Sequence, residues 1–388
     1  MGAEGLRVCV RKSGSGRVAS PSITSNGLHP KIRNVDKNHK AAINKSKQQQ
    51  VDRSRVKIGE QSGSTVKSGV MRGTDVNKGW VVAVVVGIHL AVLLPLLLHY
   101  TPTGNNGVFY YYYNRPGGEK HEFWSTDEGV VDLPITNHTH LTLIIHGFSE
   151  SSHRPWIRRL SDALLSVGKE ERVVVVVDYW DLHTINYLQM RHNARQVASL
   201  IAHLIDTLVV HKSLQLAHTH VIGFSMGGRI SGMVGSKLTT GQLGRITALD
   251  PSYPILHPVD PSETLDQNDA QLVVVLRTSL VAYYNPPGHV DFYPNGGIVQ
   301  PGCDVWFYPD IVQQSCSHFR AVKLGVEAVR RGQQQVFPSC GCDSWGSFAN
   351  NSCDCLLTSN FDLTTYSSVG GPFYLTTNSD PPYTIPFD

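Results

Sequence analysis

A serine between two glycines is the first candidate for chemistry in this 388-residue sequence. The pentapeptide Gly223-Phe-Ser-Met-Gly227 follows a strand-like run and opens a helix-like one. This is the context of a nucleophile elbow, a turn too sharp for a side chain on either side of the serine. The pattern predicts nucleophilic attack by Ser225, although one such pentapeptide also fits an ordinary strand–helix turn.

A serine hydroxyl becomes a nucleophile when an imidazole takes its proton and an acid orients that imidazole. In hydrolases built on such an elbow, the acid and then the histidine follow the serine along the chain. Asp250 is the first acidic residue after Ser225, and it ends a strand-like run. Of the histidines beyond it, His257 lies in a proline-bounded turn. Spacing favours His318, next to a helix-like segment, over His289.

Short apolar runs and one helical stripe must position these residues. The runs suit strands buried on both faces of a sheet, and apolar residues over 197–208 recur at steps of three and four, as on one face of a helix. Strands that alternate with helices indicate an α/β domain with a largely parallel sheet. The expected strands are 141–145, 172–177, 218–224, 245–249 and 272–276, and a further helix is expected over 318–330.

From about residue 106 onward, the chain resembles the pancreatic-lipase-like family of secreted animal lipases and phospholipases A1. The resemblance implies an α/β-hydrolase fold and a triad of Ser225, Asp250 and His318. It also implies an oxyanion hole formed by the backbone N–H groups of Phe148 and Met226. The segments that carry it, in the family's order, are 144–148, 220–227, 246–251, 288–297 with 300–303, and 316–322.

The same resemblance implies a calcium loop at residues 265–269. Asp266 and Asp269 are its candidate oxygen ligands, while the family's glutamate has no clean match, although Asp260 and Glu263 lie nearby. A hard cation needs six or more oxygen ligands. The catalytic chemistry requires no cofactor, and whether a structural calcium binds here is left open.

Six of the seven cysteines fall between residues 303 and 355. An even cluster of this kind indicates disulfides and an oxidising compartment. The resemblance implies the pairs Cys303–Cys316 and Cys342–Cys353, and the flanking Cys340 and Cys355 are expected to join each other.

Cys303 and Cys316 would close a lid over the active site, where a plain disulfide loop is the alternative. The lid sequence mixes polar with apolar residues, and its aromatic residues suit the headgroup zone of a lipid surface. Its apolar residues are Val305, Trp306, Phe307, Ile311 and Val312.

The N-terminal region has a different composition. Residues 1–78 hold sixteen Lys or Arg and five Asp or Glu without apolar periodicity, which predicts a disordered, solvated tail. Binding of this tail to anionic lipid or nucleic acid is the alternative. The rest of the chain has an acidic balance, so the whole is not expected to bind nucleic acid.

Residues 80–98 are almost all apolar, and a helix of that length matches the ~30 Å hydrocarbon layer of a membrane. Positive charge before it places the N-terminus inside and the catalytic domain, residues 105–388, outside. Two interpretations remain: an uncleaved signal anchor of a type II membrane protein, or a signal peptide read from Met71 that releases a secreted protein. In both, the sequons at Asn137 and Asn350 can carry glycans.

The sequence therefore favours an extracellular serine ester hydrolase that acts on glycerolipids at a membrane or lipoprotein surface. Phospholipase A1 activity is favoured over triacylglycerol lipase activity, because twelve residues separate the lid cysteines and residues 278–288 form a short segment. In the resemblance, short loops accompany an open site that admits a polar headgroup. The rival of another class is a non-catalytic lipid-binding or yolk-type storage protein, against which the intact triad argues. No C-terminal β-sandwich, and hence no colipase-type partner, is expected.

Overall fold

The computed structural model describes residues 107–253, 260–282, 287–304, 309–330, 337–353, 355, 358–364 and 369–385. No helix within these ranges is long and apolar enough to cross a membrane. The segments 1–78 and 80–98 lie outside them.

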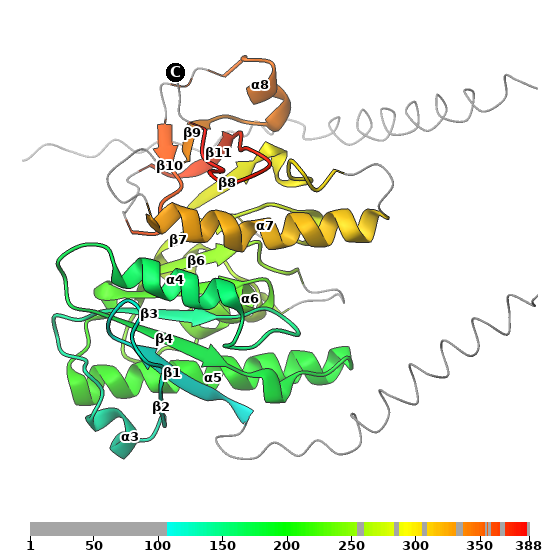
Figure 1. Cartoon of the computed structure of the whole chain (residues 1–388). Helices are drawn as coiled ribbons and strands as arrows, with labels where there is room; N and C mark the ends of the chain where they lie inside the picture. Colours follow the sequence, from blue (N-terminus) through cyan, green and yellow to red (C-terminus); the bar gives the residue numbers. More distant parts are fainter. Residues whose placement is uncertain are drawn as a thin grey trace, which may run out of the picture. The chain divides into compact units, whose positions relative to one another are not determined.

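The described strands form one mixed sheet in the order β10-β9-β11-β8-β7-β6-β5-β3-β4-β1-β2 (Figure 1). From β4 to β11 the neighbours are parallel, and antiparallel pairs occur at the two edges. The strands are β1 (Phe109–Tyr113), β2 (His121–Phe123), β3 (His140–Ile145), β4 (Arg172–Asp178), β5 (Thr219–Phe224), β6 (Leu243–Leu249), β7 (Ala270–Leu276), β8 (Val290–Pro294), β9 (Pro338–Gly341), β10 (Thr358–Asn360) and β11 (Gly371–Leu375).

The central strands follow directly from composition. In β4 the five consecutive valines are all buried, as expected for a strand covered on both faces, and β-branched side chains suit extended backbone. All five predicted strands are present, each within two residues of its expected ends. The predicted α/β architecture with a mostly parallel sheet is therefore confirmed.

Helices cover both faces of this sheet. Buried side chains of α5 and α6 share one apolar core with one face, and those of α4 and α7 share another core with the opposite face. The helices are α3 (Asp127–Val131), α4 (Pro155–Leu165), α5 (Tyr187–Lys212), α6 (Met226–Gly235), α7 (Asp310–Arg330) and α8 (Trp345–Ala349).

The helix predicted over 318–330 begins earlier than the sequence indicated. It begins at Asp310, so that His318 lies inside α7 and not at its start. Ile311 and Val312 in its first turn are exposed, and exposed apolar residues hide the helical spacing that marks a buried face. This correction means that a rigid helix, rather than a loop end, holds His318.

Candidate active site

Ser225 lies on a sharp turn between β5 and α6, at the carboxyl edge of the parallel strands. Its φ of 55° lies in the left-handed region that residues other than glycine seldom adopt. The neighbouring glycines make this turn sterically allowed. A Cβ at Gly223 would collide with the Gly227 carbonyl, and one at Gly227 would collide with the Ile145 carbonyl.

Asp250 follows β6 directly and is fully buried. Its Oδ1 accepts hydrogen bonds from the backbone N–H groups of Thr278 at 2.5 Å and Ser279 at 3.0 Å. Its Oδ2 accepts a further hydrogen bond from the Ser279 hydroxyl. These donors follow β7, the neighbour of β6, and they hold the carboxylate in one orientation.

His318 reaches this carboxylate from α7. Its Nδ1 lies 2.6 Å from Oδ2 of Asp250, and its ring packs against Phe224, the residue before Ser225, with centroids 4.6 Å apart. When Nδ1–H donates a hydrogen bond to Asp250, Nε2 is left as an acceptor. The structure thus brings Asp250 and His318 together beside the Ser225 turn, an arrangement suited to activating a hydroxyl.

The two other histidines have different positions. His289 precedes β8 at the amino edge of the parallel strands, and its Nδ1 accepts the Val273 N–H at 2.9 Å. The bond ties the ring to the β7 backbone. His257 lies outside the described residues.

Phe148 and Met226, the residues predicted to form an oxyanion hole, both lie beside Ser225. Met226 follows Ser225 and begins α6. A Cβ placed on Gly147 would lie 3.1 Å from that of Ser225, so the loop that carries Phe148 passes directly over the turn. Phe148 and Met226 line one pocket together with His183.

Polar contacts fix the loop that carries Phe148. The Gly147 N–H donates to Glu150 Oε2 at 2.9 Å, and His146 Nε2 lies 3.2 Å from Asp178 Oδ1. Burial alone would raise the pKa of Asp178, but hydrogen bonds from His146 and Ser152 outweigh it and lower that pKa below its usual range. Asp178 is therefore ionised and holds the loop in place.

Sequence reasoning missed these supporting groups. Ser279, which holds Asp250, and Asp178, which holds the loop of Phe148, both come at or just after the end of a parallel strand. That position was available as a signal, because the carboxyl ends of such strands gather the functional side chains of α/β sheets.

The candidate calcium loop is occupied by internal contacts. Asp266 Oδ1 accepts the Asn268 N–H at 2.7 Å, and Asp269 Oδ2 accepts the Asp266 N–H at 2.8 Å. Glu263 is buried among arginines, with its Oε2 2.6 Å from Arg191 Nε. Across the described ranges, no group of three or more His, Cys, Asp or Glu side chains is placed to hold a metal ion.

Three disulfides join the predicted cysteine pairs: Cys303–Cys316, Cys340–Cys355 and Cys342–Cys353.

Only part of the predicted lid is described. Ile311 and Val312 are exposed on the first turn of α7, while Val305, Trp306 and Phe307 lie outside the described residues.

The two sequon asparagines, Asn137 and Asn350, are both exposed.

Comparison with known proteins adds a further finding. The family model described as Lipase matches residues 101–383, more than half of the chain. Lipase member H of Oryctolagus cuniculus is 37% identical over 229 residues, which covers 57% of this chain and 48% of that protein. Pancreatic triacylglycerol lipase of Myocastor coypus is 30% identical over 229 residues, with coverages of 54% and 49%. The chain spans about half the length of these relatives.

Proposed function

This chain belongs to the Lipase family, and we propose that it is a serine carboxylic ester hydrolase that acts on glycerolipids at a lipid surface. The observation that carries the proposal is the buried Asp250 carboxylate, 2.6 Å from His318, beside the strained Ser225 turn. A storage protein would not require this arrangement.

The geometry supports a two-step acyl transfer. Ser225 Oγ attacks the ester carbonyl while His318 Nε2 takes its proton, and Asp250 stabilises the resulting imidazolium. The carbonyl oxygen becomes an oxyanion, which the N–H groups of Phe148 and Met226 would bind. His318 then returns the proton to the departing alcohol, and water releases the fatty acid from Ser225 by the same steps.

Exposed aliphatic residues on both sides of the Ser225 turn support a lipid surface as the place of reaction. Ile185 and Leu188, after β4, are 71% and 68% exposed, and Ile311, in the lid, is 73% exposed. The lid follows β8, and β5 lies between β4 and β8 in the sheet, so these residues flank Ser225. Residues 183–190 also contain no Asp, Glu, Lys or Arg, so their transfer into an apolar phase requires no charge to be desolvated.

Within this class we propose phospholipase A1 activity. The short segment after β7 and the twelve residues between the lid cysteines favour an open site for a polar headgroup. Triacylglycerol hydrolysis is the second candidate, favoured by the 30% identity to a pancreatic triacylglycerol lipase. We further propose an extracellular catalytic domain, either secreted or anchored by residues 80–98, because six cysteines form three disulfides.

The experiment that separates the two substrates measures fatty-acid release from phospholipid vesicles and from triacylglycerol emulsions with the same full-length enzyme. We expect faster release from phospholipid, with the acyl chain lost from position 1. Equal or faster release from triacylglycerol would reverse the substrate assignment. No release from either lipid or from a soluble short-chain ester would overturn the proposed function.

A further inference from the structure

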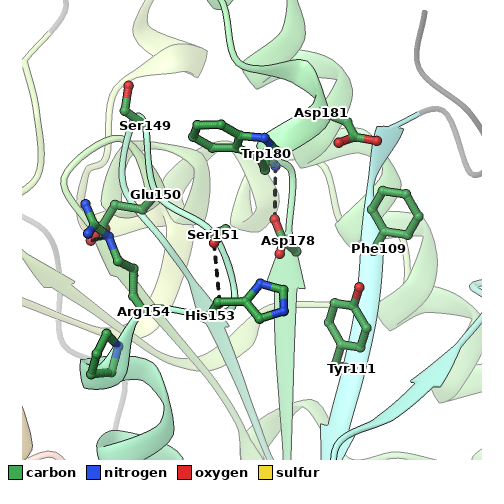
Figure 2. Close-up of a pocket in the computed structure, with 11 residues that line it drawn as sticks. Phe109, Tyr111, Ser149, Glu150, Ser151, His153, Arg154, Asp178, Trp180 and Asp181 are labelled. Atoms are coloured by element: carbon green, nitrogen blue, oxygen red, sulfur yellow. Dashed lines mark hydrogen bonds and ion pairs between the residues drawn. The ribbon is translucent and has the colours of Figure 1, made fainter. Parts of the chain in front are cut away.

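A second pocket, of about 630 Å³, lies beside the candidate active site (Figure 2). It shares Ser149, Glu150 and Trp180 with the pocket that Phe148 and Met226 line. Ser149 directly follows Phe148, the proposed oxyanion donor. If the ester of a substrate lies at Phe148, another part of the substrate can therefore reach this second pocket by passing Ser149.

Strand β1, which lies between β4 and the edge strand β2, supplies an aromatic wall. Alternate residues of a strand face the same side, so Phe109 and Tyr111 face the pocket together. Antiparallel pairing places Phe109 opposite Asp178, the last residue of β4. Trp180 and Asp181 follow β4 and also line the pocket. Strand register thus gathers three aromatic side chains and a carboxylate.

Asp181 is the carboxylate available to a ligand. The other two acidic residues of the lining are engaged, because Glu150 accepts the Gly147 N–H at 2.9 Å and Asp178 accepts the Ser152 N–H at 2.8 Å. The Asp181 side chain makes no hydrogen bond or ion pair with another residue in the described ranges. Its charge is therefore not compensated by a direct partner there.

Tyr111 already contacts one ammonium group. The Nζ atom of Lys120 lies 3.5 Å from the Tyr111 ring centroid and donates to the Ser152 hydroxyl at 2.7 Å. Burial, together with nearby carboxylates that include Asp181, raises the pKa of Tyr111 to about 12. The wall is thus a neutral aromatic surface. Phe109 and the face of Trp180 that does not stack on His183 remain for a second cation.

The opposite end of the pocket is basic. Figure 2 shows Asp181 and Trp180 toward one end and His153 and Arg154 toward the other. Arg154 is held by an ion pair, its Nε 3.1 Å from Glu150 Oε1, and its side chain is 46% exposed. His153 is exposed and can donate from its ring. The pocket therefore has an anionic, aromatic end and an end that presents imidazole and guanidinium hydrogen-bond donors.

We propose that this pocket binds the zwitterionic phosphoammonium headgroup of a phospholipid, with the ammonium at Asp181, Phe109 and Trp180 and the phosphate at His153 and Arg154. Aromatic faces with a carboxylate attract alkylammonium groups, and guanidinium groups bind phosphate oxygens. The inference rests on the proposed function, because it assigns the headgroup class of that substrate.

Binding is tested apart from hydrolysis, with free phosphocholine as the probe. Full-length Ser225→Ala protein is titrated with phosphocholine by isothermal calorimetry, alone and combined with Asp181→Asn or with Phe109→Leu. We expect saturable binding that each added substitution weakens about fivefold. The matched control is Glu128→Gln, which removes an exposed carboxylate on α3, outside the pocket, and should leave binding unchanged. Failure of phosphocholine to bind overturns the proposal.

Kinetics then test whether the ligand is the lipid headgroup. With phosphatidylcholine vesicles, Asp181→Asn and Phe109→Leu should each raise KM about fivefold with little change in kcat. With phosphatidylglycerol vesicles, which lack the ammonium, KM should stay unchanged. If phosphocholine binds but the variants keep the parent preference for phosphatidylcholine, the site serves a free metabolite and the lipid assignment is wrong. Activity of the parent enzyme on a soluble short-chain ester tests the triad separately. If the parent enzyme does not hydrolyse that ester, the proposed function fails, and not only the headgroup assignment.

Discussion

Individual aspartates in this protein differ in how their burial is compensated. Asp250 receives three hydrogen bonds, and Asp178 is held ionised by its neighbours. Burial raises the pKa of Asp269 to about 7, partly offset by the hydrogen bond from the Asp266 backbone. The packing of α6 explains this burial, because a Cβ on Gly232 would lie 2.8 Å from Asp269 Oδ2. The ionisation of Asp269 thus opposes folding.

Asp269→Asn should stabilise the protein at alkaline pH. The folded-state pKa of about 7 is above the ordinary value near 4. The contribution of protonated Asp269 to the stability of the protein is therefore fully present below about pH 4, and it is lost as the pH rises through 7. Asparagine keeps the acceptor for the Asp266 N–H without the charge.

Urea unfolding at pH 5 and pH 8, with a chelator present so that no cation stabilises the carboxylates, measures this effect. The variant's advantage at pH 8 should be about 1 to 3 kcal/mol, since each unit of pKa shift corresponds to about 1.4 kcal/mol. Exposed Glu122→Gln should show no such pH dependence. An Asp269→Asn protein less stable than the parent at pH 8 would show that the ionised carboxylate is needed.

Residue patterns predicted the nucleophile but could not position its partners. Gly223 and Gly227 indicated the elbow because backbone contact excludes any side chain at those positions. Spacing favoured His318 over His289 but did not settle the choice, since both lie far from Ser225 along the chain. The parallel sheet separates the two, because it places them at opposite edges.

At the scale of elements, α5 offers a direct test of lipid contact. Leu188 in its first turn and Val210 near its end are both 68% exposed. The first turn adjoins the active-site edge of the sheet, and the end lies at the opposite edge. A substitution of Val210 is therefore the matched control for a substitution of Leu188 on the same helix.

Ile185→Ser with Leu188→Ser should reduce partition onto phospholipid vesicles by about a hundredfold or more, because each of the two buried aliphatic side chains contributes about 1.5 kcal/mol or more. Activity on a soluble short-chain ester should be unchanged. Vesicle sedimentation measures the binding, and Val210→Ser should bind like the parent. Equal weakening by Val210→Ser would indicate non-specific adsorption and contradict the assigned lipid-facing edge.

Strands were easier to predict than the edges of the sheet. Valine runs such as β4 are unambiguous because both faces are buried. Strand β1, beside the edge strand β2, has the sequence Phe-Tyr-Tyr-Tyr-Tyr without strict alternation of burial, and β2 has three residues. The pairing of β1 with β4 depends on contacts distant in sequence, so the pocket built on β1 could not be predicted.

At the scale of the whole molecule, the compartment of the catalytic domain is open to test. Asn137 is exposed in the turn before β3. Expressed in animal cells, the protein should lose apparent mass after glycosidase treatment, and Asn137→Gln should remove part of that shift, because only a chain that enters the secretory pathway meets the glycosylation machinery. Electrophoresis measures both, with Asn350→Gln reporting the second sequon. An unglycosylated chain in the cytosolic fraction would refute the extracellular assignment.

The central claim is that Ser225, Asp250 and His318 form one catalytic unit, and a comparison of three alanine variants tests it most directly. Initial rates on phospholipid vesicles are measured for Ser225→Ala, His318→Ala and His289→Ala, with circular dichroism as the check on folding. The first two should lower kcat by a similar factor of several orders of magnitude, because residues that act together lose activity together. His289→Ala should retain most activity, since its ring bonds the β7 backbone at the other edge of the sheet. Full activity in Ser225→Ala, or a greater loss in His289→Ala than in His318→Ala, would contradict the mechanism.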